Sequence, residues 1–414
     1  MLPNDRAFTS PTLEIRSEWT VLFAILAVVG GAAFLLGISG NGALRAWQAY
    51  LVNYVFWTGL AFGAVLFSAV LNMSYARWGR PVKRLAEAFG AFLPVSFGLF
   101  WVIFFGRAEL FSWVRQPIQA KQVWLNVPFF FARNGAALLL LTVLSLALVY
   151  YSVRADRQWL AQADPTSSAP GKKPWEHSWH IQKILSPILG FVYAFALSLL
   201  AFDLIMSLDP NWYSTLFGAY YFMANFYMGI AAIYLVTLLS LNSPGLREYV
   251  HDRQLHDLGK LTLAFSVFTG YLFYAQFNTI WYGNLPDETR YVILRLNLPP
   301  WQPLAWFILF MIFVIPFSVL LNRRIKLKRS PMIVLTTVIL TGMWLERFML
   351  VAPSIWSFDF LPIGLLEMLI TAGFFGLVAL CVLLFLKRVP LIPVSDPLLQ
   401  EAIASGEIRG RLMP

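Results

Sequence analysis

A few ionisable residues lie within long apolar stretches of the chain, each close to one end of its stretch. They are Asp203, Arg133, the neighbours Glu346 and Arg347, and Glu367. Charged groups at such positions are costly in a membrane, so each is a candidate functional residue. A carboxylate that an arginine holds ionised can accept a proton. We therefore predict that Asp203 or Glu346 accepts a proton, and that Arg133 and Arg347 keep it ionised.

A second interpretation is an ion-pair network that only holds helices together. Successive residues of an α-helix diverge by about 100°, so Glu346 and Arg347 are not expected to face each other. Each then requires a partner of its own. The polar residues Asn225, Gln276 and Asn278 either continue a hydrogen-bonded path or bridge neighbouring helices.

The opposite ends of the apolar stretches carry a second set of candidates. Glu87 lies just inside one stretch, and His251, Asp252, His256 and Asp257 crowd the start of another. Histidine titrates near neutral pH, which suits proton uptake. The alternative is a hydrated helix start, at which Asp257 favours the helix N-terminus.

Residues that hold redox cofactors are scarce. The single cysteine, Cys381, excludes a disulfide, a CxxCH haem motif and a cysteine-ligated iron–sulfur cluster. No axial ligand for a membrane haem is predicted inside the helices, because the four histidines lie in loops or at a helix edge: His177, His180, His251 and His256. No zinc site and no nucleotide-binding loop is recognised. Any redox chemistry must then use a diffusible carrier and redox centres in other chains.

The elements that carry these residues are predicted to be transmembrane helices. The 414-residue chain is 59% hydrophobic and 13% charged, whereas soluble domains are about 25% charged. This excludes a soluble globular enzyme and a disordered chain. A helix of about 20 apolar residues crosses a bilayer. Ten such stretches are predicted, at 19–38, 50–73, 85–105, 128–151, 184–207, 213–241, 258–281, 301–321, 331–351 and 362–386.

The orientation follows from the basic residues. Most of the 31 lysines and arginines fall in the loops on the side of the two termini. By the positive-inside rule both termini are therefore expected in the cytoplasm. The net charge of +10 is interpreted as this topology signal, not as a nucleic-acid binding surface. A contact with anionic lipids is the second interpretation.

An internal repeat predicts two units of four helices. Residues 84–89 resemble 260–265, and residues 125–128 resemble 296–299. A repeat of four helices is parallel, about an axis along the membrane normal. The predicted fold is all-α, with about ten transmembrane helices in two parallel four-helix bundles (helices 2–5 and 6–9) and flanking helices 1 and 10. The predicted units are residues 1–49, 50–210, 211–357 and 358–414, with a flexible cytoplasmic loop at 152–183.

Two long stretches are similar to one known family. Residues 202–222 read FDLIMSLDPNWYSTLFGAYYF, and residues 256–289 read HDLGKLTLAFSVFTGYLFYAQFNTIWYGNLPDET. They resemble the NrfD/PsrC-like membrane subunits of bacterial alternative complex III, a quinol:electron acceptor oxidoreductase. Two further stretches, ARWGRPVKRLAEAF at 76–89 and LNVPFFFARN at 125–134, are most similar to subunits of the ActF type.

The resemblance implies a subunit of the bacterial inner membrane without redox cofactors of its own. The implied partners are a paralogous ActC-like membrane subunit, a periplasmic iron–sulfur subunit and multihaem cytochrome c subunits. Quinol (menaquinol or ubiquinol) is the implied substrate, near the periplasmic face, at the depth of Asp203, Glu346 and Arg347. Two roles stay open: contributing to quinol interaction and proton translocation, or serving as a non-catalytic scaffold and proton conduit. A secondary transporter is less favoured, because the charges lie near the outer face rather than the midplane.

Overall fold

The computed structural model describes residues 16–40, 42–162, 174–356 and 360–408. Within these ranges every regular element is a helix, and ten helical segments are long and apolar enough to cross a membrane. They overlap the ten predicted stretches. The prediction of an all-α, multi-pass membrane protein is therefore confirmed.

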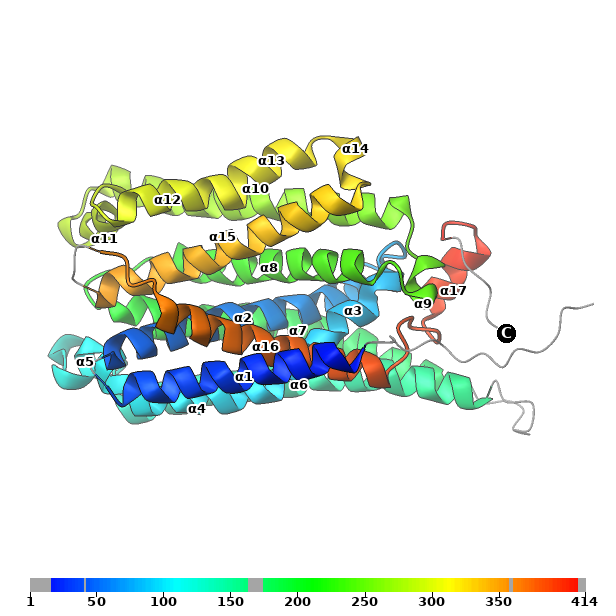
Figure 1. Cartoon of the computed structure of the whole chain (residues 1–414), viewed down its shortest axis with the longest axis horizontal. Helices are drawn as coiled ribbons and strands as arrows, with labels where there is room; N and C mark the ends of the chain where they lie inside the picture. Colours follow the sequence, from blue (N-terminus) through cyan, green and yellow to red (C-terminus); the bar gives the residue numbers. More distant parts are fainter. Residues whose placement is uncertain (1–15, 41, 163–173, 357–359, 409–414) are drawn as a thin grey trace, which may run out of the picture.

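The spanning helices run side by side along the long axis of the molecule (Figure 1). The first five segments are α1 (Ser17–Ile38), α2 (Ala43–Met73), η1 (Arg80–Val82) with α3 (Lys83–Ala88), η2 (Phe89–Phe92) and α4 (Leu93–Leu110), α6 (Val127–Gln162), and α7 (Pro174–Leu200) with η4 (Ala201–Ile205) and η5 (Met206–Leu208). The last five are α8 (Leu216–Ser240), α10 (Asp252–Gly283), α12 (Trp301–Leu309) with η6 (Phe310–Val314) and α13 (Ile315–Leu320), α15 (Arg329–Ile355) and α16 (Leu365–Arg388).

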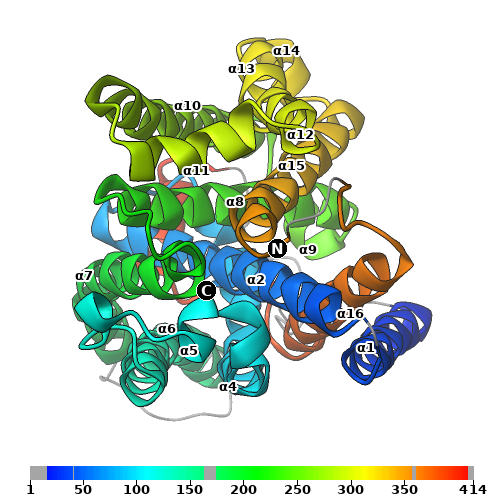
Figure 2. The same ribbon diagram turned by 90° about the vertical axis from the view of Figure 1, so that its left-hand side faces the viewer.

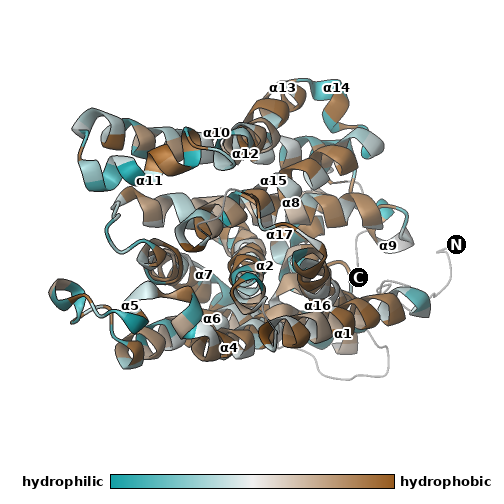
Figure 3. Ribbon diagram, turned by 60° about the vertical axis from the view of Figure 1, so that its left-hand side comes forward, coloured by the Kyte–Doolittle hydropathy of each residue, from teal (hydrophilic) through white to brown (hydrophobic). Residues whose placement is uncertain are grey.

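Short helices connect the spans at the two ends of the molecule. They are α5 (Ser112–Arg115), η3 (Gln119–Lys121), α9 (Pro244–Arg247), α11 (Pro286–Leu296), α14 (Arg323–Lys326) and α17 (Pro397–Ala404). We call the end with α5 and α11 the α11 end, and the end with α9, α14 and α17 the α17 end (Figure 1). Hydrophilic residues gather on α5 and α11, whereas the spanning helices are largely hydrophobic (Figure 3).

Helix α2 lies at the centre of the helix packing, and nearly all of its side chains are buried. It packs against α4, α6 and α7 on one side and against α8 and α15 on the other. A second group forms where α8, α10, α15 and the α12–α13 segment pack together. The view along the helices shows α2 and α8 in the middle, and α1 beside α16 at the edge (Figure 2).

Glycines let α2 and α8 approach each other backbone to backbone. A Cβ atom at Gly63 would lie 2.1 Å from the carbonyl oxygen of Asn225. One at Gly229 would lie 2.4 Å from the backbone nitrogen of Ala64. Small residues at a helix crossing allow this close packing inside a membrane.

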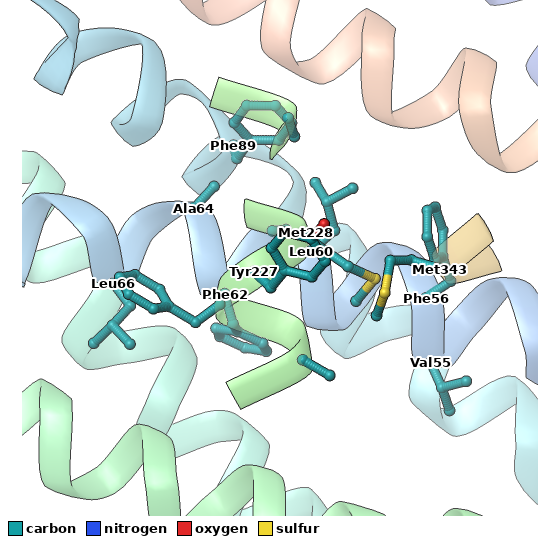
Figure 4. Packing of buried hydrophobic residues seen from close by; sticks show 14 of the residues in the cluster. Val55, Phe56, Leu60, Phe62, Ala64, Leu66, Phe89, Tyr227, Met228 and Met343 are labelled. Carbon is teal, nitrogen blue, oxygen red and sulfur yellow. The ribbon is translucent and has the colours of Figure 1, made fainter. Parts of the chain in front are cut away.

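Apolar side chains fill the middle of the molecule around this crossing. Phe56 and Leu60 of α2, Met228 of α8 and Met343 of α15 are all buried there, and Figure 4 shows them gathered where the three helices meet.

The prediction of a flexible loop at 152–183 is wrong for most of these residues. Helix α6 continues to Gln162, and α7 already begins at Pro174. Arg154 and Arg157 lie beyond the apolar stretch, but the helix continues through them because arginine is a good helix former. The part of this segment that is rich in Pro, Ser and Gly, residues 165–171, lies outside the described residues.

Candidate functional site

A cavity of about 370 Å³ lies at the α11 end of the second helix group. Its walls come from α8, α10, α11, α12, η6 and α15, so segments far apart in the sequence surround one space. Most lining side chains are apolar, and a few polar groups converge among them, which is typical of a site for a small organic ligand. The polar lining residues include Tyr220, Gln276, Tyr291, Arg295, Asn297 and Glu346.

Glu346 supplies the carboxylate of the cavity wall. Its Oε1 accepts a hydrogen bond from the Tyr220 hydroxyl at 2.6 Å, and its Oε2 pairs with Nη1 of Arg347 at 2.6 Å. Glu346 is 5% exposed and Arg347 is fully buried. The guanidinium balances the charge of the carboxylate, and a carboxylate at a cavity wall can accept a proton from a bound ligand.

The expectation that Glu346 and Arg347 do not face each other is wrong. Their side chains leave the helix in different directions, but both are long and flexible enough to bend toward each other. Arg347 also donates from Nη2 to Oδ1 of Asn225 at 2.9 Å, and its guanidinium lies 4.5 Å from the ring centre of Tyr221. The pair therefore joins the cavity to the contact between α2 and α8.

Gln276 of α10 brings an amide to the same cavity. Its side chain is 9% exposed. Gln276 is therefore available to donate to, or accept from, a ligand in the cavity.

The part of the wall formed by α11 is held rigidly by stacked side chains. The ring of Tyr291 lies parallel to the indole of Trp212, with centroids 3.7 Å apart and planes 6° apart. The guanidinium carbon of Arg295 lies 3.4 Å from the same tyrosine ring. Both groups cannot occupy one face of the ring at these distances, so Tyr291 lies between them.

An ion pair between Arg290 and Asp209 adds a second contact at the α11 end, beside the stacked rings of Trp212 and Tyr291. Arg290 of α11 donates from Nη2 to both carboxylate oxygens of Asp209, at 2.6 and 2.7 Å. Asp209 lies in the segment between η5 and α8, three residues before Trp212, and the Trp212 backbone N–H donates to its carbonyl oxygen at 3.0 Å. The ion pair and the stacked rings together fix this segment against α11.

A π-helical turn, η6, forms another part of the wall. The carbonyl oxygen of Ile312 accepts hydrogen bonds from the hydroxyls of Tyr227 (3.1 Å) and Ser266 (2.9 Å). Neighbouring helices thus satisfy a backbone group that the widened turn leaves free. Single π turns recur at functional sites, and Ile312 lines the cavity.

Asp203 lies in the other π-helical turn, η4, and the structure brings it together with Arg133. Arg133 donates to each carboxylate oxygen at 2.7 Å. Trp124 donates to Oδ1 at 3.0 Å, and Asn134 donates to Oδ2 at 2.6 Å. Asp203 is fully buried. Its carboxylate is thus enclosed by four hydrogen bonds from the protein.

A second cavity, of about 290 Å³, lies close to Asp203 but does not include it. Trp124, Phe202 and Tyr213 are among the residues that line this space. Trp212 lines both cavities, so its indole separates them. Of the two predicted carboxylates, Glu346 borders a cavity and Asp203 does not.

Glu367 serves as a link between helices. Its carboxylate accepts hydrogen bonds from Nε and Nη2 of Arg45 at 2.7 and 2.8 Å, and from the backbone N–H of Gly364 at 2.8 Å. These contacts tie the start of α16 to the start of α2. Glu367 lies outside both cavities.

Glu87 belongs to a buried charge cluster at the α17 end. Arg84 forms ion pairs with both Glu87 and Asp156. The hydroxyls of Ser68 and Ser152 donate to Glu87 at 2.9 and 3.0 Å. All five side chains are buried. Each buried charge of this cluster therefore has a partner of opposite charge, which offsets the cost of removing it from water.

The C-terminal segment covers this cluster and adds a third carboxylate. Asp396 accepts hydrogen bonds from Arg80 at 2.9 Å and Lys83 at 3.1 Å, and Ser395 donates to Asp156 from its backbone and its hydroxyl. Burial raises the pKa of Asp396, but the two cations outweigh it and leave the pKa below its ordinary value. Arg80 and Lys83 are therefore buried partners rather than free loop charges.

The histidine and aspartate group at the start of α10 is partly exposed. The backbone N–H of His251 donates to the Gln254 side chain at 3.0 Å, and Asp257 pairs with Lys260 at 3.0 Å. His256 and Asp252 lie in the same first turns. Nδ1 of His251 and Nδ1 of His256 are buried without a hydrogen-bond partner among the described residues, and a role of this group in proton uptake stays a prediction. Among the residues that the structure describes, no group of three His, Cys, Asp or Glu side chains is placed to hold a metal ion.

Several residues of these sites were not predicted from the sequence. Asp209 and Tyr291 lie in connecting segments, where a polar residue is no surprise, and Asp156 and Asp396 lie beyond the apolar stretches. One signal was present: Ser395-Asp396-Pro397 is a typical helix start, and Asp396 does accept from the backbone N–H of Leu398 at 3.1 Å.

A protein-family model matches most of the chain. The model of the family described as polysulphide reductase, NrfD, matches residues 37–359. No curated protein matches the chain. The matched range includes the cavity, Asp203 and Glu87, and ends before the C-terminal segment.

Proposed function

Because the chain belongs to the NrfD family, whose members are membrane subunits of quinol oxidoreductase-type complexes, we propose that it contributes a quinol-binding site to such a complex. The assembly we propose is of the alternative complex III type, in which this chain is the ActF-like subunit. Members of the family partner with iron–sulfur subunits. The electrons of the quinol would leave to such a partner.

One observation carries this proposal: an apolar cavity next to a buried, paired carboxylate. The cavity of about 370 Å³ offers aromatic and aliphatic walls to a quinone ring. Glu346 and Gln276 offer polar atoms to its oxygens. A lipid-soluble substrate needs this combination, because its ring is apolar and its two oxygens carry the reacting protons.

The chemistry assigned to the cavity is the removal of two protons and two electrons from quinol. A carboxylate takes a hydroxyl proton as an electron leaves the ring, and Glu346 is placed for that step. We assign the α11 end to the outer side of the membrane, because α14, which carries Arg323, Arg324 and Lys326, lies at the other end (Figure 1). Protons released at the α11 end then leave on the outer side.

Asp203 is assigned a structural role beside this site. Its carboxylate already accepts four hydrogen bonds, from Arg133, Trp124 and Asn134, and it borders neither cavity. A proton acceptor must be within reach of its donor. Glu346 meets that condition and Asp203 does not.

The second role, a non-catalytic scaffold and proton conduit, is favoured by one observation. Glu87 and its partners form a buried ionisable cluster at the α17 end, where protons from the cytoplasm would enter. Buried apolar residues, among them Leu60 and Met228, gather near the crossing of α2 and α8 (Figure 4). A conduit through the chain would need water to enter among them.

A photoreactive quinone tests the site directly. The purified complex is irradiated with an azidoquinone, and the labelled peptides are mapped with and without an excess of unlabelled quinol analogue. Label that is displaced by the competitor should fall on α10, α11 or α15. Label confined to a paralogous subunit would overturn the proposal and leave this chain with the scaffold role.

A further inference from the structure

The hydroxyl of Tyr291 stands out among the polar groups of the cavity wall. Tyr291 lines the cavity, and its hydroxyl is buried without a hydrogen-bond partner among the described residues. Folded proteins pair nearly all of their buried polar groups, and phenylalanine would fill the same space without leaving a hydroxyl unpaired. The indole N–H of Trp212, which lines the same cavity, is likewise buried without a partner. Two neighbouring residues of this wall thus carry donors to which the described part of the chain supplies no acceptor.

Other side chains cover both faces of the Tyr291 ring. The indole of Trp212 lies parallel to the ring, with centroids 3.7 Å apart. The guanidinium carbon of Arg295 lies 3.4 Å from the centre of the ring. Because these two groups take up the faces, the ring can border the cavity only with its edge, and the hydroxyl is attached to that edge.

The position of this hydroxyl is fixed by the fold. Arg295 is held by hydrogen bonds from its guanidinium to the carbonyl oxygens of Met349 and Leu350 and to the hydroxyl of Ser354, at 3.2, 3.3 and 2.7 Å. It also donates to the carbonyl oxygen of Tyr291 itself, at 3.1 Å. A donor that is already held in place loses little conformational freedom when it binds a ligand.

We propose that the Tyr291 hydroxyl donates a hydrogen bond to an oxygen of the ligand, and that it thereby selects ring systems that carry oxygen. This inference rests on the proposed quinol site and names a donor for it. A tyrosine hydroxyl keeps its proton at neutral pH, so it can donate to a carbonyl or hydroxyl oxygen, whereas an ionised Glu346 can only accept. The cavity then offers both a donor and an acceptor, which suits a ring with two oxygens.

The selection follows from the cost of an unpaired donor. A ring of the same shape without oxygen would gain contacts with apolar wall residues such as Phe273, Phe277 and Ile308, but it would leave the Tyr291 hydroxyl without an acceptor. Sites built to hydrogen-bond a ligand discriminate in this way against analogues that lack the bonding group. The preference of the cavity for a quinone over a hydrocarbon of similar shape should therefore depend on Tyr291.

The Tyr291→Phe variant tests this role by ligand binding in the purified complex. The azidoquinone label is displaced either by naphthoquinone or by naphthalene, which has the same two fused rings and no oxygen. We expect half-displacement in the variant to require about 3- to 10-fold more naphthoquinone than in the wild type, because one hydrogen bond is lost. The naphthalene concentration should change by less than about twofold, because naphthalene forms no such bond.

Thermal unfolding separates a loss of binding from a loss of folding. Without ligand, the midpoint for Tyr291→Phe should be unchanged or higher, because the variant removes an unpaired buried hydroxyl. A fixed concentration of naphthoquinone should raise this midpoint less in the variant than in the wild type. Tyr282→Phe is the matched control, because Tyr282 is 88% exposed, and it should behave like the wild type in both measurements.

The outcomes distinguish this inference from the proposed quinol site. Equal weakening of naphthoquinone and naphthalene would mean that Tyr291 only shapes the wall, and unchanged displacement by naphthoquinone would mean that its hydroxyl does not touch the ligand. Either result overturns the inference, while displaceable label on the wild-type chain keeps the quinol site intact. Absence of displaceable label on the wild-type chain would instead overturn the proposed function.

Discussion

Glu346 and Arg347 follow each other on α15 and form a buried ion pair, with Oε2 and Nη1 2.6 Å apart. The glutamate borders the cavity, whereas the arginine reaches Asn225 on α8. These two neighbouring residues thus connect the cavity to the crossing of α2 and α8. A change at Glu346 is expected to affect both chemistry and packing, so both must be measured.

Replacing Glu346 by glutamine should abolish proton acceptance in the cavity, because an amide does not take up a proton at neutral pH. We expect kcat for quinol oxidation by the purified complex to fall by about 10²- to 10⁴-fold. Glu109→Gln is the control, since Glu109 is an exposed carboxylate paired with Arg115. Turnover at the wild-type rate in Glu346→Gln would remove Glu346 from the mechanism.

Replacing Asp203 by asparagine should weaken the fold more than the chemistry. The change leaves Arg133, whose side chain is only 9% exposed, without its counter-ion, which costs about 3–5 kcal/mol. Thermal unfolding in detergent should show a lower midpoint, while kcat per folded complex stays near that of the wild type. A variant that unfolds normally but turns over slowly would return Asp203 to the role of proton acceptor.

Replacing Gly63 by alanine should separate α2 from α8. The new Cβ would lie 2.1 Å from a backbone oxygen, and overpacking of this kind costs about 1–3 kcal/mol. Gly31→Ala is the matched control, because a Cβ there has no neighbour within 4 Å. Equal unfolding midpoints for the two variants would mean that the crossing is less tight than described.

The docking of the C-terminal segment should depend on pH through Asp396. Its pKa in the folded protein lies below its ordinary value of 3.8. The ionised carboxylate therefore stabilises docking fully above pH 3.8, and this stabilisation is lost as the pH falls through the lower, folded value. The rate of maleimide labelling of Leu399→Cys, in a Cys381→Ala background, is divided by the rate for the unfolded chain at the same pH, because acid removes the reactive thiolate from both. This ratio should be low at neutral pH and higher at about pH 3.

Two further variants check the assignment to Asp396. Asp396→Asn should speed this labelling at neutral pH, because Arg80 and Lys83 lose their shared partner. Glu401→Gln should change it little, since the Glu401–Arg77 pair is exposed and such pairs are worth about 0–1 kcal/mol. Labelling of Asp396→Asn at the wild-type rate would show that apolar contacts alone hold the segment.

The spans could be predicted because a membrane selects them by composition. Ten stretches of apolar residues were enough to locate ten helices, but their ends were not, since α6 and α7 extend well past the apolar residues. The candidate carboxylates could be identified for the same reason: Asp203 and Glu346 are charges in apolar surroundings. Which of them borders a cavity could not be predicted, because cavity walls are assembled from helices that are distant in the sequence.

The amino-acid sequence by itself determined the class of protein, the number of crossings and the set of costly charges, since each depends on local composition. The tertiary structure alone decided how those charges are used. It pairs Asp203 with Arg133, places Glu346 beside a cavity, and sets Tyr291 between Trp212 and Arg295. Pairing and exposure depend on distances between helices, and these are fixed by packing such as that of Gly63 against α8.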